Sequence, residues 1–349
     1  MATLPSTATV HDGLPPALDK VAEQAPPTHA FLRRQWYAAA LAAYGGTART
    51  LVVRRGDEPL LALPFVASGP AWLRVAGVPG CYWPFRSFPA ADTSAPVLDA
   101  ALAALPLRAL RIGPVYDGDP GVTALLDRAR AAGWAIRSRQ LADSYLLDIA
   151  AEPQPWPRNS TLRKNRFHEK HLAAHGSLDR RFVSGADWPR AFDALAAVEE
   201  KSWIASRTDG ADAKFTATGH GAFWRAAAAD PVLAQMMRAA LLTVDGVPAA
   251  FSFDLDVGTH RYAIANSYAP AIAKHSPGRL LQYRNLVDAR ARGIRTVDWG
   301  MGDSGYKQAL GAVAGPAFAD WLLLKPGMTA MAGRMLQRRW TGGPASARA

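Results

Sequence analysis

The stretch that decides the fold runs from Ala239 to Gly311 and begins AALLTVDGVPAAFSFDLDVGTHRYAIANSY (239–268). Turns at 245–246 and 258 divide its apolar runs, which predicts strands over 240–244, 249–257 and 261–268. Because Asp-Gly turns make tight hairpins, these neighbouring strands should be antiparallel. The next part, SPGRLLQYRNLVDARARG (276–293), predicts a helix, and 294–299 predicts another strand. This order can set a helix N-terminus beside two splayed strands, an arrangement that suits an anionic ligand.

The rest of the chain predicts two mixed α/β domains with mostly antiparallel sheets. Prolines clustered over 153–157 stop regular structure and mark the boundary. We expect a disordered leader over 1–27, a first domain over 28–152, a second over 153–327, and a basic terminal helix and tail over 328–349. Within the first domain we expect a helix over 31–44 that Thr28 caps, a hairpin over 50–66 and a long strand over 134–149.

The composition limits the class of protein and of partner. The 349 residues carry 40 basic and 29 acidic side chains, a net charge of +11, which favours anionic partners such as CoA, nucleotide-linked sugars, RNA or acidic lipids. Arginine-rich codon usage explains the same charge equally well. The single cysteine, Cys81, excludes an intrachain disulfide and a cysteine-based zinc site. No apolar run reaches the roughly 20 residues of a membrane span, and we expect a cytoplasmic location.

The start of the 276–293 helix is the first candidate site. Ser276 and Pro277 are residues that begin helices, and Gly278 would let a ligand approach the backbone. Arg279 lies in the first turn, where a cation is unfavourable unless an anion is nearby. We therefore expect Ser276, Gly278 and Arg279 to bind an anionic donor. The alternative is an ordinary capped helix with a solvated arginine.

The second candidate is the glycine-rich turn 300–307, which places Asp303, Tyr306 and Lys307 after a strand. It is a near miss for the phosphate loop G-x-x-x-x-G-K-[ST], because Tyr306 displaces the lysine and Gln308 replaces the magnesium-binding hydroxyl. A nucleotide triphosphatase is therefore rejected. A lysine here can hold a carbonyl oxygen, and an aspartate can accept a proton from an amine.

The segment that follows the proline cluster supplies the remaining candidates. It is rich in cations, among them Arg163 and Arg166, and either binds an anion or forms a solvated face. His168, His171 and His175 share one helical face, but their order is not that of a known zinc motif, so we expect no metal. No G-x-S-x-G motif is present, and a covalent nucleophile is not expected.

Several runs together resemble one family. They are Glu199-Glu200-Lys201-Ser202-Trp203, Ala249-Ala250-Phe251, Tyr268-Ala269-Pro270, Ser276 to Leu281, and Asp298-Trp299-Gly300 with Asp303, Tyr306 and Lys307. They resemble the Fem-like branch of the GNAT acyltransferase superfamily, which includes CelD-type proteins associated with cellulose biosynthesis. The resemblance covers about 158–324 and implies tandem GNAT-like domains. The sequence departs from the usual Q/R-x-x-G-x-G/A donor loop, since only Gly278 remains, and this puts ordinary acetyl-CoA binding in doubt.

What the resemblance implies is an N-acyltransferase that moves an acyl group from acyl-CoA to an amine acceptor, such as an amino sugar or an envelope or exopolysaccharide precursor. It assigns catalysis to Lys307, Asp303 and Tyr306, and donor binding to Ser276, Gly278 and Arg279. We expect substrate contacts from Arg163, Arg166, Glu199, Trp203 and Arg207. One alternative is a Fem-type transferase that uses aminoacyl-tRNA, and another is a non-catalytic scaffold in polysaccharide biosynthesis. The sequence names neither the acyl group nor the oligomeric state.

Overall fold

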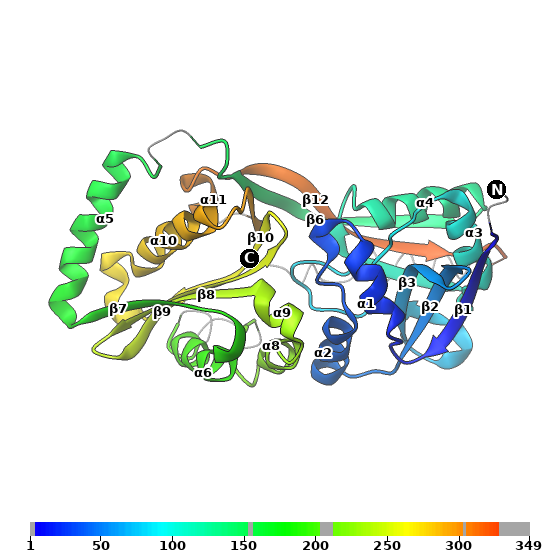
Figure 1. Cartoon of the computed structure of the whole chain (residues 1–349), viewed down its shortest axis with the longest axis horizontal. Helices are drawn as coiled ribbons and strands as arrows, with labels where there is room; N and C mark the ends of the chain where they lie inside the picture. The colour runs from blue at the N-terminus through cyan, green and yellow to red at the C-terminus, as the bar shows by residue number, and fades with distance from the viewer. Residues whose placement is uncertain (1–3, 153–155, 203–211, 303–304, 328–349) are drawn as a thin grey trace. The chain divides into compact units, whose positions relative to one another are not determined.

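The structure is a computed structural model that describes residues 4–152, 156–202, 212–302 and 305–327. The chain forms two compact units (Figure 1). Unit 1 takes the residues up to Tyr145 and those from Met301 onward, and unit 2 takes Leu146–Gly300. Both units combine helices with a mixed, mostly antiparallel sheet, which confirms the predicted fold class. None of the helices in the described ranges is both long and apolar enough to span a lipid bilayer.

Unit 1 is built around seven strands in the order β1-β2-β3-β4-β5-β12-β6. Strands β4 and β5 pair in parallel, whereas β1–β2, β2–β3, β3–β4 and β5–β12 pair antiparallel. The elements are β1 (Ser6–Asp12), α1 (Ala17–Gln24), α2 (Arg34–Tyr44), β2 (Ala48–Arg55), β3 (Glu58–Ala67), β4 (Val75–Gly77), α3 (Ala95–Ala104), β5 (Ala109–Tyr116), α4 (Pro120–Ala131), β6 (Ala135–Asp148), α11 (Tyr306–Ala309) and β12 (Val313–Leu324).

The N-terminal segment corrects one expectation. We predicted a disordered leader over 1–27, but Ser6–Asp12 is the edge strand β1 and Ala17–Gln24 is helix α1. The strand pairs with β2 from Ser6↔Arg55 to Asp12↔Arg49, so its backbone is satisfied by a neighbour far along the chain. Thr28 lies in a 3-10 turn and does not cap α2, which begins at Arg34. Strand β12, which we assigned to the second domain, pairs with strands of unit 1.

Unit 2 contains the predicted meander, with strand order β11-β10-β9-β8-β7. All its neighbouring strands are antiparallel except β10 and β11. The elements are α5 (Asn159–Leu172), β7 (Leu178–Val183), α6 (Trp188–Glu199), α8 (Gly221–Ala227), α9 (Pro231–Met236), β8 (Met237–Val244), β9 (Val247–Val257), β10 (His260–Tyr268), α10 (Pro277–Ala291) and β11 (Thr296–Met301). The predicted terminal helix lies outside the described residues.

Helices cover both faces of the unit 2 sheet (Figure 1). On one face, Ala240 and Leu242 pack with Leu280 and Leu281 of α10. On the other face, aromatic rings surround Phe253, with contributions from α6, α8 and Phe215. Side chains alternate between the two faces along a strand, and helices cover both faces here. A run such as 239–242 is therefore apolar at every position.

Candidate active site

The strands β10 and β11 diverge beside the start of helix α10. They pair in parallel over three residue pairs, from His260↔Thr296 to Tyr262↔Asp298. Just past this region the register of β10 with β9 shifts between Ala263 and Ala265, which is a β-bulge. A bulge increases local twist and turns a strand away from its neighbour. The two strands thus share a direction but separate toward their carboxyl ends, as the sequence predicted.

Helix α10 begins without a side-chain cap. Ser276 adopts the left-handed conformation, with φ 51° and ψ 47°, and its side chain makes no capping hydrogen bond. Our prediction that Ser276 caps the helix is therefore wrong, because a capping serine normally has extended backbone angles. Pro277 has no N–H to satisfy. Within the described residues the backbone N–H groups of Gly278 and Arg279 donate to no backbone carbonyl and to no capping side chain. They can therefore bind an anion.

The start of α10 lies very close to strand β10. A Cβ atom added at Gly278 would stand 2.9 Å from Asn266 Oδ1 and 3.0 Å from Tyr268 Cδ1. Glycine is thus required by packing, a role for Gly278 that needs no ligand. Asn266 Nδ2 is buried and forms no hydrogen bond in the described structure. The helix start therefore combines free backbone amides with an unsatisfied side-chain amide. A polar residue near the end of an otherwise apolar strand was the available sequence signal for Asn266.

Arg279 is a half-buried cation without an ion-pair partner among the described residues. Its guanidinium lies over the Tyr283 ring, with its central carbon 5.7 Å from the ring centroid. The pKa of His168 on α5 is lowered by burial and by the positive charges of Lys164 and Arg279. Mutual repulsion among these cations favours an anion at this place. The unpaired charge supports the prediction that Arg279 contacts an anionic donor.

Lys307 is buried in unit 1, in the first turn of the short helix α11. Its ammonium donates to the carbonyl oxygens of Met301, at 2.9 Å, and Gly302, and lies 5.6 Å from the Tyr145 ring centroid. Lys307 therefore holds the end of strand β11 at Met301 and Gly302. Tyr306 is 43% exposed, and Asp303 lies outside the described residues. These three residues fall in unit 1, whereas Ser276, Gly278 and Arg279 fall in unit 2.

Glu199 is fully buried at the end of α6. Its carboxylate accepts backbone N–H groups from Lys214 at 2.9 Å, Phe215 at 2.7 Å and Thr216. Burial raises its pKa to about 7, and the three hydrogen bonds oppose that rise. Both carboxylate oxygens are thus engaged by backbone, so Glu199 anchors a neighbouring segment and presents no open oxygen to a substrate.

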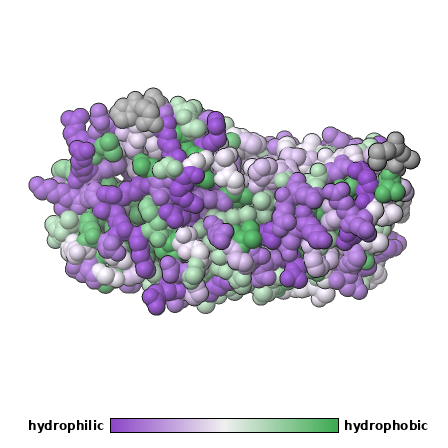
Figure 2. Space-filling view, in the orientation of Figure 1, coloured by the Kyte–Doolittle hydropathy of each residue, from purple (hydrophilic) through white to green (hydrophobic). Residues whose placement is uncertain are grey.

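The other predicted substrate residues that the structure describes lie on α5, a helix that contacts α10. Arg163 and Arg166 are exposed on α5, at the end of unit 2 where hydrophilic side chains are abundant (Figure 2). Trp203 and Arg207 lie outside the described residues. His175 Nε2 lies 2.8 Å from His275 Nε2, but the described residues hold no group of three or more ligands that fits a metal ion.

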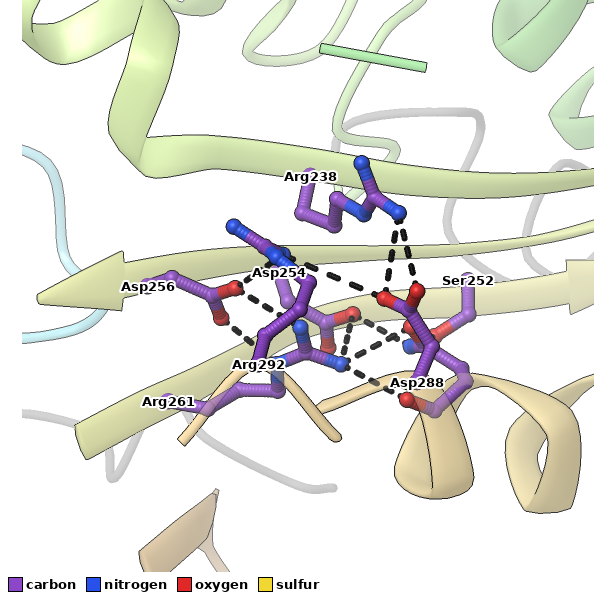
Figure 3. A network of polar contacts seen from close by, with 8 residues as sticks. Arg238, Ser252, Asp254, Asp256, Arg261, Asp288 and Arg292 are labelled. Carbon is purple, nitrogen blue, oxygen red and sulfur yellow. Dashed lines mark hydrogen bonds and ion pairs between the residues drawn. The ribbon is translucent and has the colours of Figure 1, made fainter. Parts of the chain in front are cut away.

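A buried polar network holds α10 on the sheet, and the sequence analysis missed it (Figure 3). Arg261 on β10 forms a bidentate ion pair with Asp256, at 2.6 and 2.7 Å, and donates to Asn285 Oδ1 of α10 at 2.8 Å. Asn285 in turn donates to Ser252 Oγ at 3.0 Å and to Asp254, whose pKa burial raises to about 6. The sequence signal for this network was the pair Asp254 and Asp256, two aspartates two residues apart in an otherwise apolar strand. The network fixes the helix whose N-terminus forms the candidate site.

Comparisons with known proteins agree with this geometry. Residues 159–308 match the family model described as an acetyltransferase (GNAT) domain. No curated protein sequence is detectably similar to the chain. Among solved structures, FemX aligns over 92% of this chain and 97% of its own, with a TM-score of 0.60 and 12% identity.

Two further structures share the fold. A conserved protein of unknown function from Bacteroides thetaiotaomicron aligns over 91% of this chain and 100% of its own, with a TM-score of 0.57 and 11% identity. The third structure is the C-terminal domain of a protein provisionally named a lysylphosphatidylglycerol synthetase, from Agrobacterium fabrum. It aligns over 93% of this chain and 95% of its own, with a TM-score of 0.51 and 17% identity. At these identities the likeness establishes the fold alone.

The family match and the site together define the class of protein. The residues that match the GNAT acetyltransferase model, 159–308, include the splayed strands and all of α10. This match supports N-acyltransferase activity of the GNAT type. The CelD-type branch suggested by the sequence is a finer assignment that the comparisons leave open.

Proposed function

We propose that the protein transfers an acyl group from acyl-CoA, acetyl-CoA being the simplest case, to the amine of an acceptor. The observation that carries the proposal is the uncapped N-terminus of α10 beside the splayed strands, with Arg279 unpaired next to it. Free N–H groups and a guanidinium suit the phosphates of CoA. Asn266, unsatisfied at the same helix start, would donate a further hydrogen bond to the donor.

The proposed reaction is direct attack of the amine nitrogen on the carbonyl carbon of the thioester. The carbon–sulfur bond breaks, the CoA thiolate leaves, and the amine loses one proton. Asp303, directly or through water, would accept that proton, as the resemblance implies. Lys307 would stabilise the tetrahedral oxyanion, and Tyr306 would protonate the leaving thiolate.

The acceptor is proposed from the resemblance to the Fem-like and CelD-type branch. It would be an amino sugar or another precursor of the cell envelope or an exopolysaccharide. The alternative donor is aminoacyl-tRNA. The basic surface of α5, which includes Arg163 and Arg166, favours that alternative because it could contact the phosphate backbone of RNA.

Native mass spectrometry of freshly purified protein tests the donor class. A retained CoA thioester supports the main proposal, and retained RNA supports the alternative. The Arg279→Glu variant should bind acyl-CoA about 10- to 100-fold more weakly if a charge-assisted phosphate contact is lost. Arg295→Glu, an exposed substitution in the same unit, is the matched control. Equal donor affinity of Arg279→Glu, Arg295→Glu and the unmodified protein in calorimetry would remove Arg279 from the site.

A transfer assay separates donor from acceptor. The protein is offered acetyl-CoA together with glucosamine as the amine, and free thiol release is followed. RNase treatment should leave the rate unchanged with a CoA donor and abolish it with an aminoacyl-tRNA donor. Absence of transfer to any amine from either donor would leave the scaffold role that the sequence also allows.

A further inference from the structure

Unit 1 contains a cavity of about 180 Å³ whose lining includes none of the residues proposed for donor binding. Its walls come from the end of α2, from β4 and the segment after it, and from β5. The lining includes Tyr44, Gly77, Gly80, Arg86, Arg111 and Gly113. Two of these residues are arginines and three are glycines, so charged side chains and exposed backbone share a small space.

Arg86 is the informative wall residue. Its Nε donates to the carbonyl oxygen of Gly80 at 3.0 Å, which fixes the plane of the guanidinium. Across the described residues the Arg86 guanidinium forms no ion pair within 4 Å and no other hydrogen bond, although Asp320 lies near enough to act on its charge. Burial and the nearby charge of Arg111 lower its pKa, yet a guanidinium stays charged at neutral pH. A partly buried cation with free N–H groups therefore lines the cavity.

Arg111 is held in place by Asp320 of β12. Its Nη2 donates to Asp320 Oδ2 at 2.8 Å, and Arg139 Nη2 donates to the same oxygen at 2.6 Å. Gly113 makes room for this carboxylate, because a Cβ there would stand 2.8 Å from Asp320 Oδ1. One carboxylate thus serves two guanidinium groups, and Arg86 adds a third positive charge. This excess of positive charge around a cavity favours a negatively charged occupant.

We propose that this cavity binds a small oxyanion, either a phosphate monoester or a carboxylate, between Arg86 and Arg111. An arginine fork matches both groups because each offers two coplanar acceptor oxygens. The cavity is smaller than the 300–1,000 Å³ of typical sites for drug-sized ligands, so it suits a head group and not a whole nucleotide. Tyr44 can contribute its hydroxyl, since burial raises its pKa and keeps the phenol protonated at neutral pH.

Calorimetric titration with inorganic phosphate, methyl phosphate and acetate at low ionic strength tests the site. The titrations use the full chain, and they are repeated in the Arg279→Glu background so that binding at α10 does not contribute. Arg86→Gln should weaken the binding of at least one probe tenfold or more. Arg137→Gln, an exposed substitution in the same unit and outside the cavity lining, should leave it unchanged. The preference between methyl phosphate and acetate identifies the ligand chemistry.

Two results overturn the proposal. One is equal affinity in Arg86→Gln and the unmodified protein, and the other is no binding of any probe at tens of millimolar. If circular dichroism shows that Arg86→Gln is not folded, the titrations are repeated with Arg86→Lys. It keeps the charge but loses the planar fork, so affinity should fall several-fold. An Arg86→Lys affinity equal to that of the unmodified protein also refutes the site.

Discussion

The buried carboxyl group of Glu199 makes the stability of the protein depend on pH in a predictable direction. Its pKa is raised from an ordinary value of 4.5 to about 7, with burial as the main cause. The folded state therefore binds a proton more tightly than the unfolded state does. The stability that this proton confers is fully present below pH 4.5 and is lost as the pH rises toward and through about 7. Raising the pH should thus destabilise the fold.

The size of the effect follows from the two pKa values. A difference of about 2.5 between them corresponds to roughly 3 kcal/mol, since each factor of ten in acidity is about 1.4 kcal/mol. About 2.5 kcal/mol of this total falls between pH 5 and pH 8.5. The Glu199→Gln variant cannot titrate, although it loses an acceptor for the amides of Lys214 and Phe215. The contribution of the carboxyl group is therefore measured from how the stability of this variant changes with pH, and not from its stability at any one pH.

Urea unfolding of the unmodified protein, Glu199→Gln and Glu200→Gln at several pH values measures this difference. The unfolding free energy of Glu199→Gln relative to the unmodified protein should rise by about 2.5 kcal/mol from pH 5 to pH 8.5. Glu200 is exposed, so Glu200→Gln should show no such trend. A flat difference for Glu199→Gln would refute the reasoning. A difference of opposite sign would mean that the three backbone hydrogen bonds outweigh burial.

Three further outcomes are expected. Lys307→Met should lower kcat about 100-fold with little change in donor affinity, and a normal kcat with a raised KM would assign the lysine to binding alone. Gly278→Ala should cost about 1–3 kcal/mol in urea unfolding, because its Cβ would press on Asn266 and Tyr268, and unchanged stability would contradict that close approach. Arg261→Met should cost about 3–5 kcal/mol by leaving buried carboxylates unpaired, and a loss no larger than that of an exposed arginine variant would argue against the network.

The sequence predicted the meander of unit 2 closely because its signals are local. The strands predicted over 240–244, 249–257 and 261–268 lie within β8, β9 and β10, and the Asp-Gly turn at 245–246 sets the β8–β9 hairpin. The leader was mispredicted because β1 gains its stability from β2, roughly 40 residues away. The conformation of Ser276 was missed for a similar reason, since strand packing at Gly278 and not the local cap preference fixes the start of α10.

The candidate site was only partly predictable. Arg279 was predicted to contact an anion from its unfavourable place in the first helical turn, which is a local signal. Asn266 and the Arg261 network depend on which strand lies beneath α10, and no short motif encodes that placement. Glu199 was read as a substrate residue because it lies in a familiar run, whereas its partners, the amides after residue 213, could not be inferred from spacing.

Strand β12 has a consequence for how the chain is made. It lies between β5 and β6, paired with β5 from Phe318↔Tyr116 to Leu324↔Ala109, so the sheet of unit 1 is interrupted until this late segment arrives. On the ribosome, unit 2 has all its strands once Gly300 has emerged, while two open strand edges in unit 1 still wait for a partner. A premature stop shortly after residue 300 would therefore damage the half of the protein that was synthesised first. Nascent unit 1 is the part most exposed to mispairing and to chaperone binding.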